Sequence, residues 1–245
     1  MIRGFIDGIQ GYLKAIPYLF YPWVLRLLLV SGLVSLICFS LLACCLYFFG
    51  GNSGEFILNF FFEDGPPEWL SSIVSIASQL VLWILLFLVL KYIILIVTAP
   101  FMSLLSERLE EKLRDGYKDP QPGQLYSLVR GLRLSLSNLV REIFLLTILF
   151  VFSFIPGLAI FTIVLTFMVQ SYYAGFGNID FFMERRFSIK QSRNFIRRHK
   201  GFAMANGFVF LFLFLIPILG AILAPALATI SGTITSVKLI EEGKF

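Results

Sequence analysis

Four long stretches of this chain contain no charged residue: 27–54, 70–90, 143–179 and 201–237. A helix needs about 20 consecutive apolar residues to cross a bilayer. Only 14% of the chain is charged, whereas a soluble domain usually carries about 25%. We therefore expect an all-α integral membrane protein that forms a single membrane domain over residues 1–245.

The positions of the basic residues predict the orientation of these stretches. The chain has 20 Lys and Arg, and the connector 50–69 contains none of them but carries four carboxylates. Because basic residues collect on the cytoplasmic side, the connector is expected to be periplasmic and the other polar segments cytoplasmic. This orientation makes 22–49 the first span and 69–115 the second span, with a cytoplasmic extension.

The two longest uncharged stretches are predicted to form hairpins, at 124–183 and 201–240, because each begins and ends on the cytoplasmic side. Their tips are expected at Pro156, Gly157, Pro217 and Gly220, since proline interrupts a helix and glycine permits a reversal. The arm 143–155 contains 13 residues, or about 20 Å of helix, which is less than the ~30 Å hydrocarbon core. That length favours re-entrant hairpins, with full two-span hairpins as the alternative.

Two shorter helices are expected at the cytoplasmic surface. Residues 1–20 have apolar positions at helical spacing, which predicts an interfacial amphipathic helix. A stripe of small residues on it would allow close packing on other helices. Residues 187–200 are rich in Arg and Lys, and Ser188 with Gln191 resembles a capping box. We expect a basic surface helix there, facing solvent or anionic lipid headgroups.

The segment 98–110, Thr-Ala-Pro-Phe-Met-Ser-Leu-Leu-Ser-Glu-Arg-Leu-Glu, resembles the A-P-F-x-x-L-L-x-E-x-L-E segment of the CysZ-like sulfate permease family. The proline breaks and the N-terminal helix with its spaced glycines are also similar, so the resemblance covers nearly the whole chain. It implies a bacterial inner-membrane protein that imports sulfate for cysteine synthesis. It further implies two full spans, two hemi-penetrating hairpins and a homo-oligomer.

The resemblance also implies an anion-binding segment at Arg26, Trp23 and Val24. Members of the family commonly carry adjacent arginines there after a proline–glycine turn, whereas this chain has Leu25 before Arg26 and Trp23 in place of glycine. The departure puts sulfate specificity in doubt. Amides at a helix start and a guanidinium both suit an oxyanion, but Arg26 could instead be a membrane anchor.

Other polar residues lie within or beside the apolar stretches. Lys91, Gln79, Gln170 and Asn206 are candidates for a pore or its mouth. The simpler interpretations are that Lys91 extends to the inner interface and that the amides form hydrogen bonds between helices. Arg130, Arg133 and Arg141 partly share a helix face, which would draw anions to an inner mouth unless they only set topology.

Nothing in the sequence points to an enzyme. The single histidine, His199, lies in a basic stretch, and no metal-ligand spacing or nucleotide-binding loop occurs. We expect no cofactor, metal or nucleic acid, and sulfate or a related oxyanion and membrane lipids as partners. The sequence thus predicts a permease or channel for sulfate or a similar oxyanion, with a non-transporting scaffold or lipid-organising protein as the alternative.

Overall fold

The computed structural model describes residues 2–49, 68–116, 123–153, 155, 157–216 and 219–243, and these residues form helices without any strand. The prediction of an all-α protein is therefore confirmed. Most of the connector predicted at 50–69 lies outside the described residues. In chain order the helices are α1 (Ile2–Ala15), the 3-10 helix η1 (Ile16–Phe20), α2 (Pro22–Phe49), α4 (Glu68–Leu113), α5 (Gln124–Ser153), α6 (Ala159–Met183), α7 (Ile189–Arg198), α8 (Lys200–Phe214) and α9 (Leu219–Glu241).

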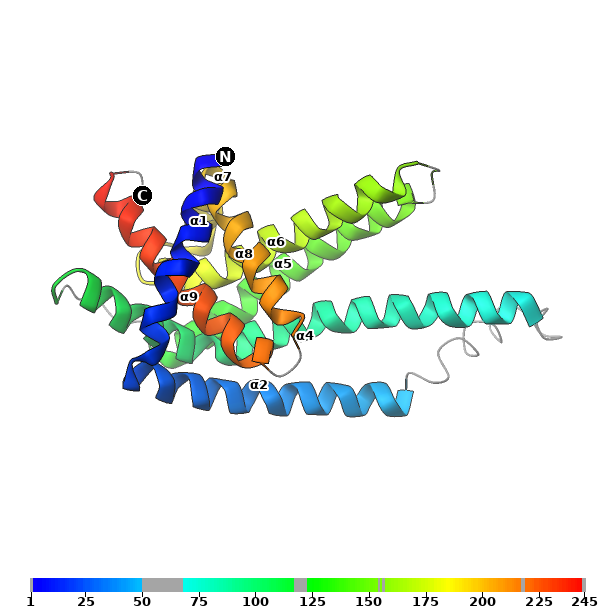
Figure 1. Cartoon of the computed structure of the whole chain (residues 1–245), viewed down its shortest axis with the longest axis horizontal. Helices are drawn as coiled ribbons and strands as arrows, with labels where there is room; N and C mark the ends of the chain where they lie inside the picture. Colours follow the sequence, from blue (N-terminus) through cyan, green and yellow to red (C-terminus); the bar gives the residue numbers. More distant parts are fainter. Residues whose placement is uncertain are drawn as a thin grey trace.

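Several of these helices are long and apolar enough to cross a membrane. The segments that qualify by length and composition are Leu88–Leu113, Leu125–Ser153, Ala159–Met183 and Gly220–Glu241. In addition, the helical segment that ends at Phe20 and α2 form a pair bent by 98°. Helices α2 and α4 lie side by side along the length of the molecule (Figure 1). This arrangement confirms an all-α membrane protein.

The first hairpin, α5 and α6, lies within the predicted range 124–183, but its first helix extends well beyond the uncharged arm 143–155. Helix α5 contains 30 residues, or about 45 Å, rather than an arm of 13 residues, because it continues through Arg130 and Glu142. Both charged side chains are buried, so they do not mark the end of the packed helix. The length of the uncharged arm therefore does not set the length of the helix, and how deeply this hairpin enters the bilayer stays a prediction. In the second hairpin, α8 has only 15 residues, about 22 Å.

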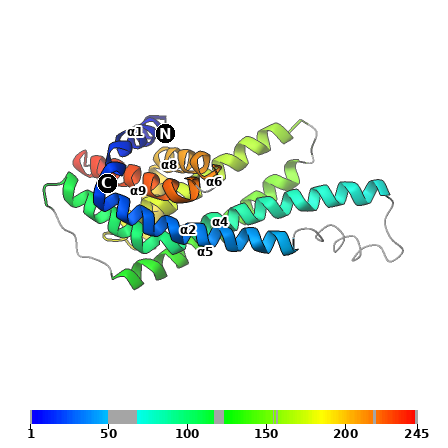
Figure 2. The same ribbon diagram turned by 60° about the horizontal axis from the view of Figure 1, so that its bottom comes forward.

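The outer parts of α5 and α6 project away from the other helices (Figures 1 and 2). Large apolar side chains on these parts are exposed, among them Phe144, Phe150, Ile160, Phe161 and Ile163. These exposed apolar side chains on both helices suit contact with lipid tails rather than with water.

The hairpin of α8 and α9 lies at the centre of the fold, where α1 covers it. The Tyr12 hydroxyl on α1 donates to the Asn206 carbonyl on α8 over 2.7 Å. A Cβ at Gly11 would overlap the hydroxyls of Ser231 and Thr235 on α9. The predicted stripe of small residues therefore does bring α1 against its neighbours at close range.

A second close approach joins the two hairpins. Helices α6 and α8 cross where Gly175 faces Gly207, and a Cβ on either glycine would overlap a backbone carbonyl, of Ala203 or Ser171 respectively. Only glycine fits at this crossing, so the two hairpins are held together backbone to backbone.

Candidate functional site

The residues predicted to bind an anion lie at the bend between η1 and α2. Arg26 is exposed, Trp23 is half-buried and Val24 is fully buried. Trp23 and Val24 belong to the first turn of α2, whose backbone N–H groups have no acceptor within the helix. Among the described residues, no carboxylate forms an ion pair with Arg26. The exposed guanidinium is therefore available to an anion from outside the chain.

A second cation lies beside this helix start. The Lys112 Nζ, from the last turn of α4, sits 3.5 Å from the centre of the Tyr21 ring. Tyr21 immediately precedes α2 and donates its backbone N–H to the Tyr18 carbonyl. Because Leu25 stands where the family has an arginine, Lys112 is a source of positive charge near the bend that the sequence did not suggest.

Lys91 lies elsewhere, inside the packed part of the fold. Its Nζ contacts the Glu142 Oε1 at 2.7 Å, and neither side chain has any exposed surface. The Tyr92 hydroxyl donates to the other carboxylate oxygen over 2.5 Å. The expectation that Lys91 extends to the interface is therefore wrong, since a partner on α5 compensates its charge inside the protein.

Arg130 is likewise buried in a pair instead of being free to draw anions. Its guanidinium donates to both carboxylate oxygens of Asp180 over 2.9 Å. It also donates to the Phe187 carbonyl over 2.6 Å and to the Ser192 hydroxyl over 2.9 Å. This two-pronged contact fixes α5 to the end of α6 and to α7.

The segment that carried the family resemblance presents Glu110 to three arginines. Glu110 accepts from Arg114 at 3.0 Å, from Arg185 at 3.1 Å and from Arg186 at 2.5 Å. The pair with Arg114, four residues later, is an i, i+4 contact at the end of α4. The other two contacts connect α4 to the loop that follows α6, so this buried carboxylate has a structural role.

Glu184, directly after α6, is a buried carboxyl group that receives hydrogen bonds from the hydroxyls of Ser103 and Ser127. Burial raises the pKa of Glu184 to about 7, and the two hydroxyl donors offset only part of that effect. The group therefore exchanges a proton in the physiological pH range.

The remaining predicted residues do not converge on one site. Asn206 is buried on α8, where its amide nitrogen donates to the Ala228 carbonyl over 2.9 Å, so it joins helices as the simpler interpretation expected. Gln170 is half-buried on α6. Gln79 lies on a part of α4 whose side chains are outside those described.

The two breaks predicted as hairpin tips each contain a described glycine. Gly157 has φ +85°, and the Leu158 N–H donates to the Ile155 carbonyl over 3.1 Å between α5 and α6. Gly220 lies against the end of α8, where a Cβ would overlap the Leu213 carbonyl. Pro156 and Pro217 lie outside the described residues.

Two buried asparagines have side-chain amides that form no hydrogen bond with any described residue. Asn138 on α5 and Asn178 on α6 are almost fully buried. The amide nitrogen and oxygen of each have no hydrogen-bond partner among the described residues. Buried amides of this kind are normally satisfied by a protein group or an ordered water, so each of these two side chains can still accept and donate a hydrogen bond to a further polar group.

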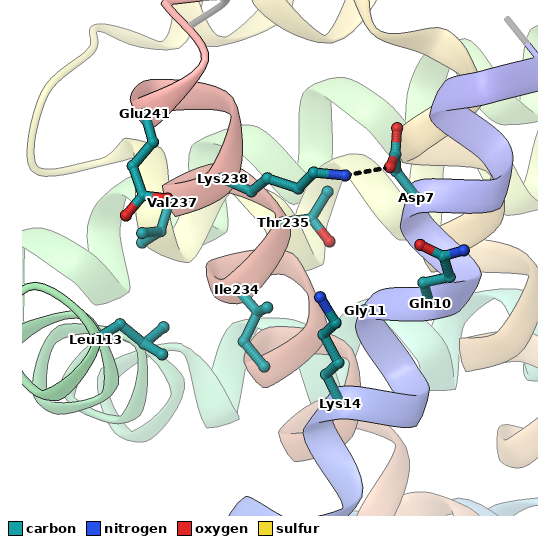
Figure 3. A pocket seen from close by; sticks show the side chains of 10 residues that line it. All are labelled: Asp7, Gln10, Gly11, Lys14, Leu113, Ile234, Thr235, Val237, Lys238 and Glu241. Carbon is teal, nitrogen blue, oxygen red and sulfur yellow. Dashed lines mark hydrogen bonds and ion pairs between the residues drawn. The ribbon is translucent and has the colours of Figure 1, made fainter.

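A pocket of about 220 Å³ opens between α1 and α9 (Figure 3). The Lys238 Nζ contacts the Asp7 Oδ1 at 2.6 Å across it. Lys14 and Glu241 also line it. Since two acidic and two basic side chains share the pocket, it offers no clear preference for an anion.

Sequence reasoning missed the acidic partners Glu142, Asp180 and Glu184. A signal for two of them was present, because Glu142 and Asp180 border the uncharged stretch 143–179 at its two ends. Counting only the basic residues predicted the orientation of the chain in the membrane. It could not predict these ion pairs, because their partners are about 50 positions apart in the chain.

A protein-family model described as "Sulfate transporter CysZ/Etoposide-induced protein 2.4" matches residues 12–225. The match extends from α1 into α9 and includes the bend at Arg26 and the buried ion pairs of Lys91, Arg130 and Arg185. No curated protein matches the chain.

Proposed function

Because the chain belongs to the sulfate transporter CysZ/etoposide-induced protein 2.4 family, we propose that it is a membrane permease or channel for sulfate or a related oxyanion. In this proposal it lies in a bacterial inner membrane, where the imported anion supplies sulfur for cysteine synthesis. Transport is driven by a gradient or a coupled ion, and the chain itself carries out no enzymatic reaction.

The observation that carries the proposal is the exposed Arg26 in the first turns of α2. A helix start offers N–H groups and the positive end of the helix dipole to an anion. The Arg26 guanidinium adds a planar fork that matches two oxygens of a tetrahedral oxyanion. Lys112, held against Tyr21, contributes further positive charge beside the same bend.

The apolar outer parts of α5 and α6 support the proposed partners. Side chains such as Phe161 and Ile163 are exposed on this hairpin, and water is a poor environment for them. Lipid tails or the hairpin of a second copy would cover this surface. We propose a homo-oligomer in lipid on this basis.

Sulfate uptake into vesicles that contain only the purified protein tests the transport proposal. Uptake above that of empty vesicles supports it, whereas the absence of uptake favours a scaffold that does not transport.

Sulfate binding by variants of Arg26 tests the site. Losing a contact between charged groups costs about 1.5–3 kcal/mol, so Arg26→Ala should weaken sulfate binding about ten- to hundredfold. Arg26→Lys should also lose much of the affinity, because a lysine ammonium cannot reproduce the fork. Arg3→Ala, which removes a positive charge from an exposed position on α1, is the control. Unchanged sulfate affinity in both Arg26 variants, measured by calorimetry, would reject this site.

A further inference from the structure

A group of arginines at the junction of α5 and α7 lacks the carboxylate partners that Lys91, Arg130 and Arg185 have. Arg193 on α7 reaches across to α5, where its guanidinium donates to the Ser137 hydroxyl over 3.2 Å. Arg141 lies one helical turn after Ser137, and Arg197 lies one turn after Arg193. The i, i+4 spacing on both helices places Arg141 and Arg197 beside this contact, within electrostatic range of Arg193.

Two tyrosines of α6 lie close to these three arginines. Tyr172 and Tyr173 lie within electrostatic range of all three guanidiniums. Tyr173 is buried and Tyr172 is half-buried, so their rings limit the water that can screen the arginines. Their hydroxyls add neutral donors to a set of groups that otherwise consists of cations.

The charge of the three arginines is not compensated within the described part of the chain. No carboxylate there forms an ion pair with any of them. Glu142 is near Tyr173, but both of its oxygens are already bound by Lys91 and Tyr92. The Nε of Arg193 is buried and has no hydrogen-bond partner among the described residues.

Holding like charges together without a counter-charge is unfavourable. Burial and the neighbouring Arg141 and Arg197 lower the pKa of Arg193 from its ordinary value, which is the expected sign of this repulsion. Elsewhere in the fold, Lys91, Arg130 and Arg185 each have a carboxylate. The exception at the α5–α7 junction therefore suggests that the counter-charge comes from a ligand.

We propose that Arg141, Arg193 and Arg197, with Tyr172 and Tyr173, form a second binding site, specific for a tetrahedral oxyanion. The ligand is either the phosphate of an anionic lipid headgroup or a free anion such as sulfate. Guanidinium groups bind both through paired hydrogen bonds. This site does not involve Arg26, and its existence does not depend on transport.

The test measures two ligands separately on the full-length chain in detergent. Native mass spectrometry measures the binding of the anionic lipid phosphatidylglycerol. Phosphatidylcholine, which has no net charge, is the control lipid. Calorimetry measures the binding of sodium sulfate to protein that also carries Arg26→Ala, so that an ion at the start of α2 does not contribute. Arg141→Gln and Arg197→Gln should each weaken binding about ten- to hundredfold in at least one of the two measurements.

Arg198→Gln is the matched control, because Arg198 is adjacent to Arg197 on α7 and equally exposed to solvent. Weaker binding of phosphatidylglycerol alone identifies a lipid headgroup, and weaker binding of sulfate alone identifies a free anion. Weaker binding of both identifies a site that accepts either source. If Arg141→Gln does not fold, the exposed Arg197→Gln decides the test alone. The proposal is overturned if neither ligand binds the parent protein, if neither measurement changes, or if Arg198→Gln has an equal effect.

Discussion

The buried pair of Lys91 and Glu142 provides the sharpest test of how this fold tolerates charge. We expect Glu142→Gln to be strongly destabilising, because it leaves the Lys91 ammonium without a counter-charge where its side chain has no exposed surface. Lys91→Met should be somewhat less harmful, since the Tyr92 hydroxyl still donates to the Glu142 carboxylate. The double variant removes both charges and leaves Tyr92 an amide oxygen as its acceptor.

The expected magnitudes follow from burial and distance. At the 2.7 Å separation of Lys91 Nζ and Glu142 Oε1, the attraction is on the order of 6 kcal/mol for an effective dielectric constant of about 20. Desolvation of the two ions offsets most of it, so the intact pair contributes little net stability. Breaking a buried pair nevertheless costs about 3–5 kcal/mol, whereas replacing both partners often costs almost nothing. The double variant should therefore unfold within about 2 kcal/mol of the parent protein.

A double-mutant cycle checks this reasoning, with the free energy of unfolding of each variant measured in mixed micelles. Because the two single costs sum to far more than the cost of the double variant, the two substitutions should couple by at least about 4 kcal/mol, which is above the usual range for residues in contact. If Glu142→Gln costs less than about 1 kcal/mol, or if the two single costs simply add, the pair is not a desolvated unit. Sulfate uptake by the double variant then tests the pore prediction for Lys91, which requires uptake to fall although stability is retained.

Two further results are expected. Gly207→Ala should destabilise the protein by about 1–3 kcal/mol or more, because the new Cβ meets the Ser171 carbonyl, whereas Gly232→Ala on α9 meets only ordinary contacts and is the control in thermal unfolding. Burial raises the pKa of Glu184 to about 7, above the ~4.3 of an exposed glutamate. The folded state therefore holds this proton more tightly, and the stability that it contributes, on the order of 4 kcal/mol, is present below about pH 4 and lost as the pH rises to about 7. Glu184→Gln should make the midpoint temperature of thermal unfolding less dependent on pH between pH 5 and 8. If the midpoint of this variant changes with pH as steeply as that of the parent protein, the role of this carboxyl group is contradicted.

Much of the fold could be predicted from the sequence because apolar length and charge act locally. The 14-residue α1 follows from its apolar spacing. The capping box at Ser188 was also predicted, and the structure confirms it, with Gln191 as the reciprocal partner. Both features depend on residues within a few positions of each other, so no knowledge of the tertiary fold was needed.

The length of α5 could not be predicted in the same way. The sequence did not predict that Arg130 and Glu142 are buried on this helix, since an isolated charge is costly to bury. Their partners Asp180 and Lys91 are about 50 residues away in the chain, and only the tertiary fold reveals that the charges are matched. Lys112 near the bend was missed for the same reason, because its contact with Tyr21 joins α4 to the residue before α2.

The contact of α1 with the last hairpin has a consequence for how the chain is made. Tyr12 and its acceptor Asn206 are separated by 194 positions. At a synthesis rate of about 5–20 residues per second, roughly 10–40 seconds pass between the appearance of the two residues. During that interval Gly8, Gly11 and Tyr12, which are buried in the finished protein, have no α8 or α9 to cover them. The N-terminal helix therefore remains without its packing partners during synthesis until α8 and α9 have been made, and α1 packs into the fold only after that point.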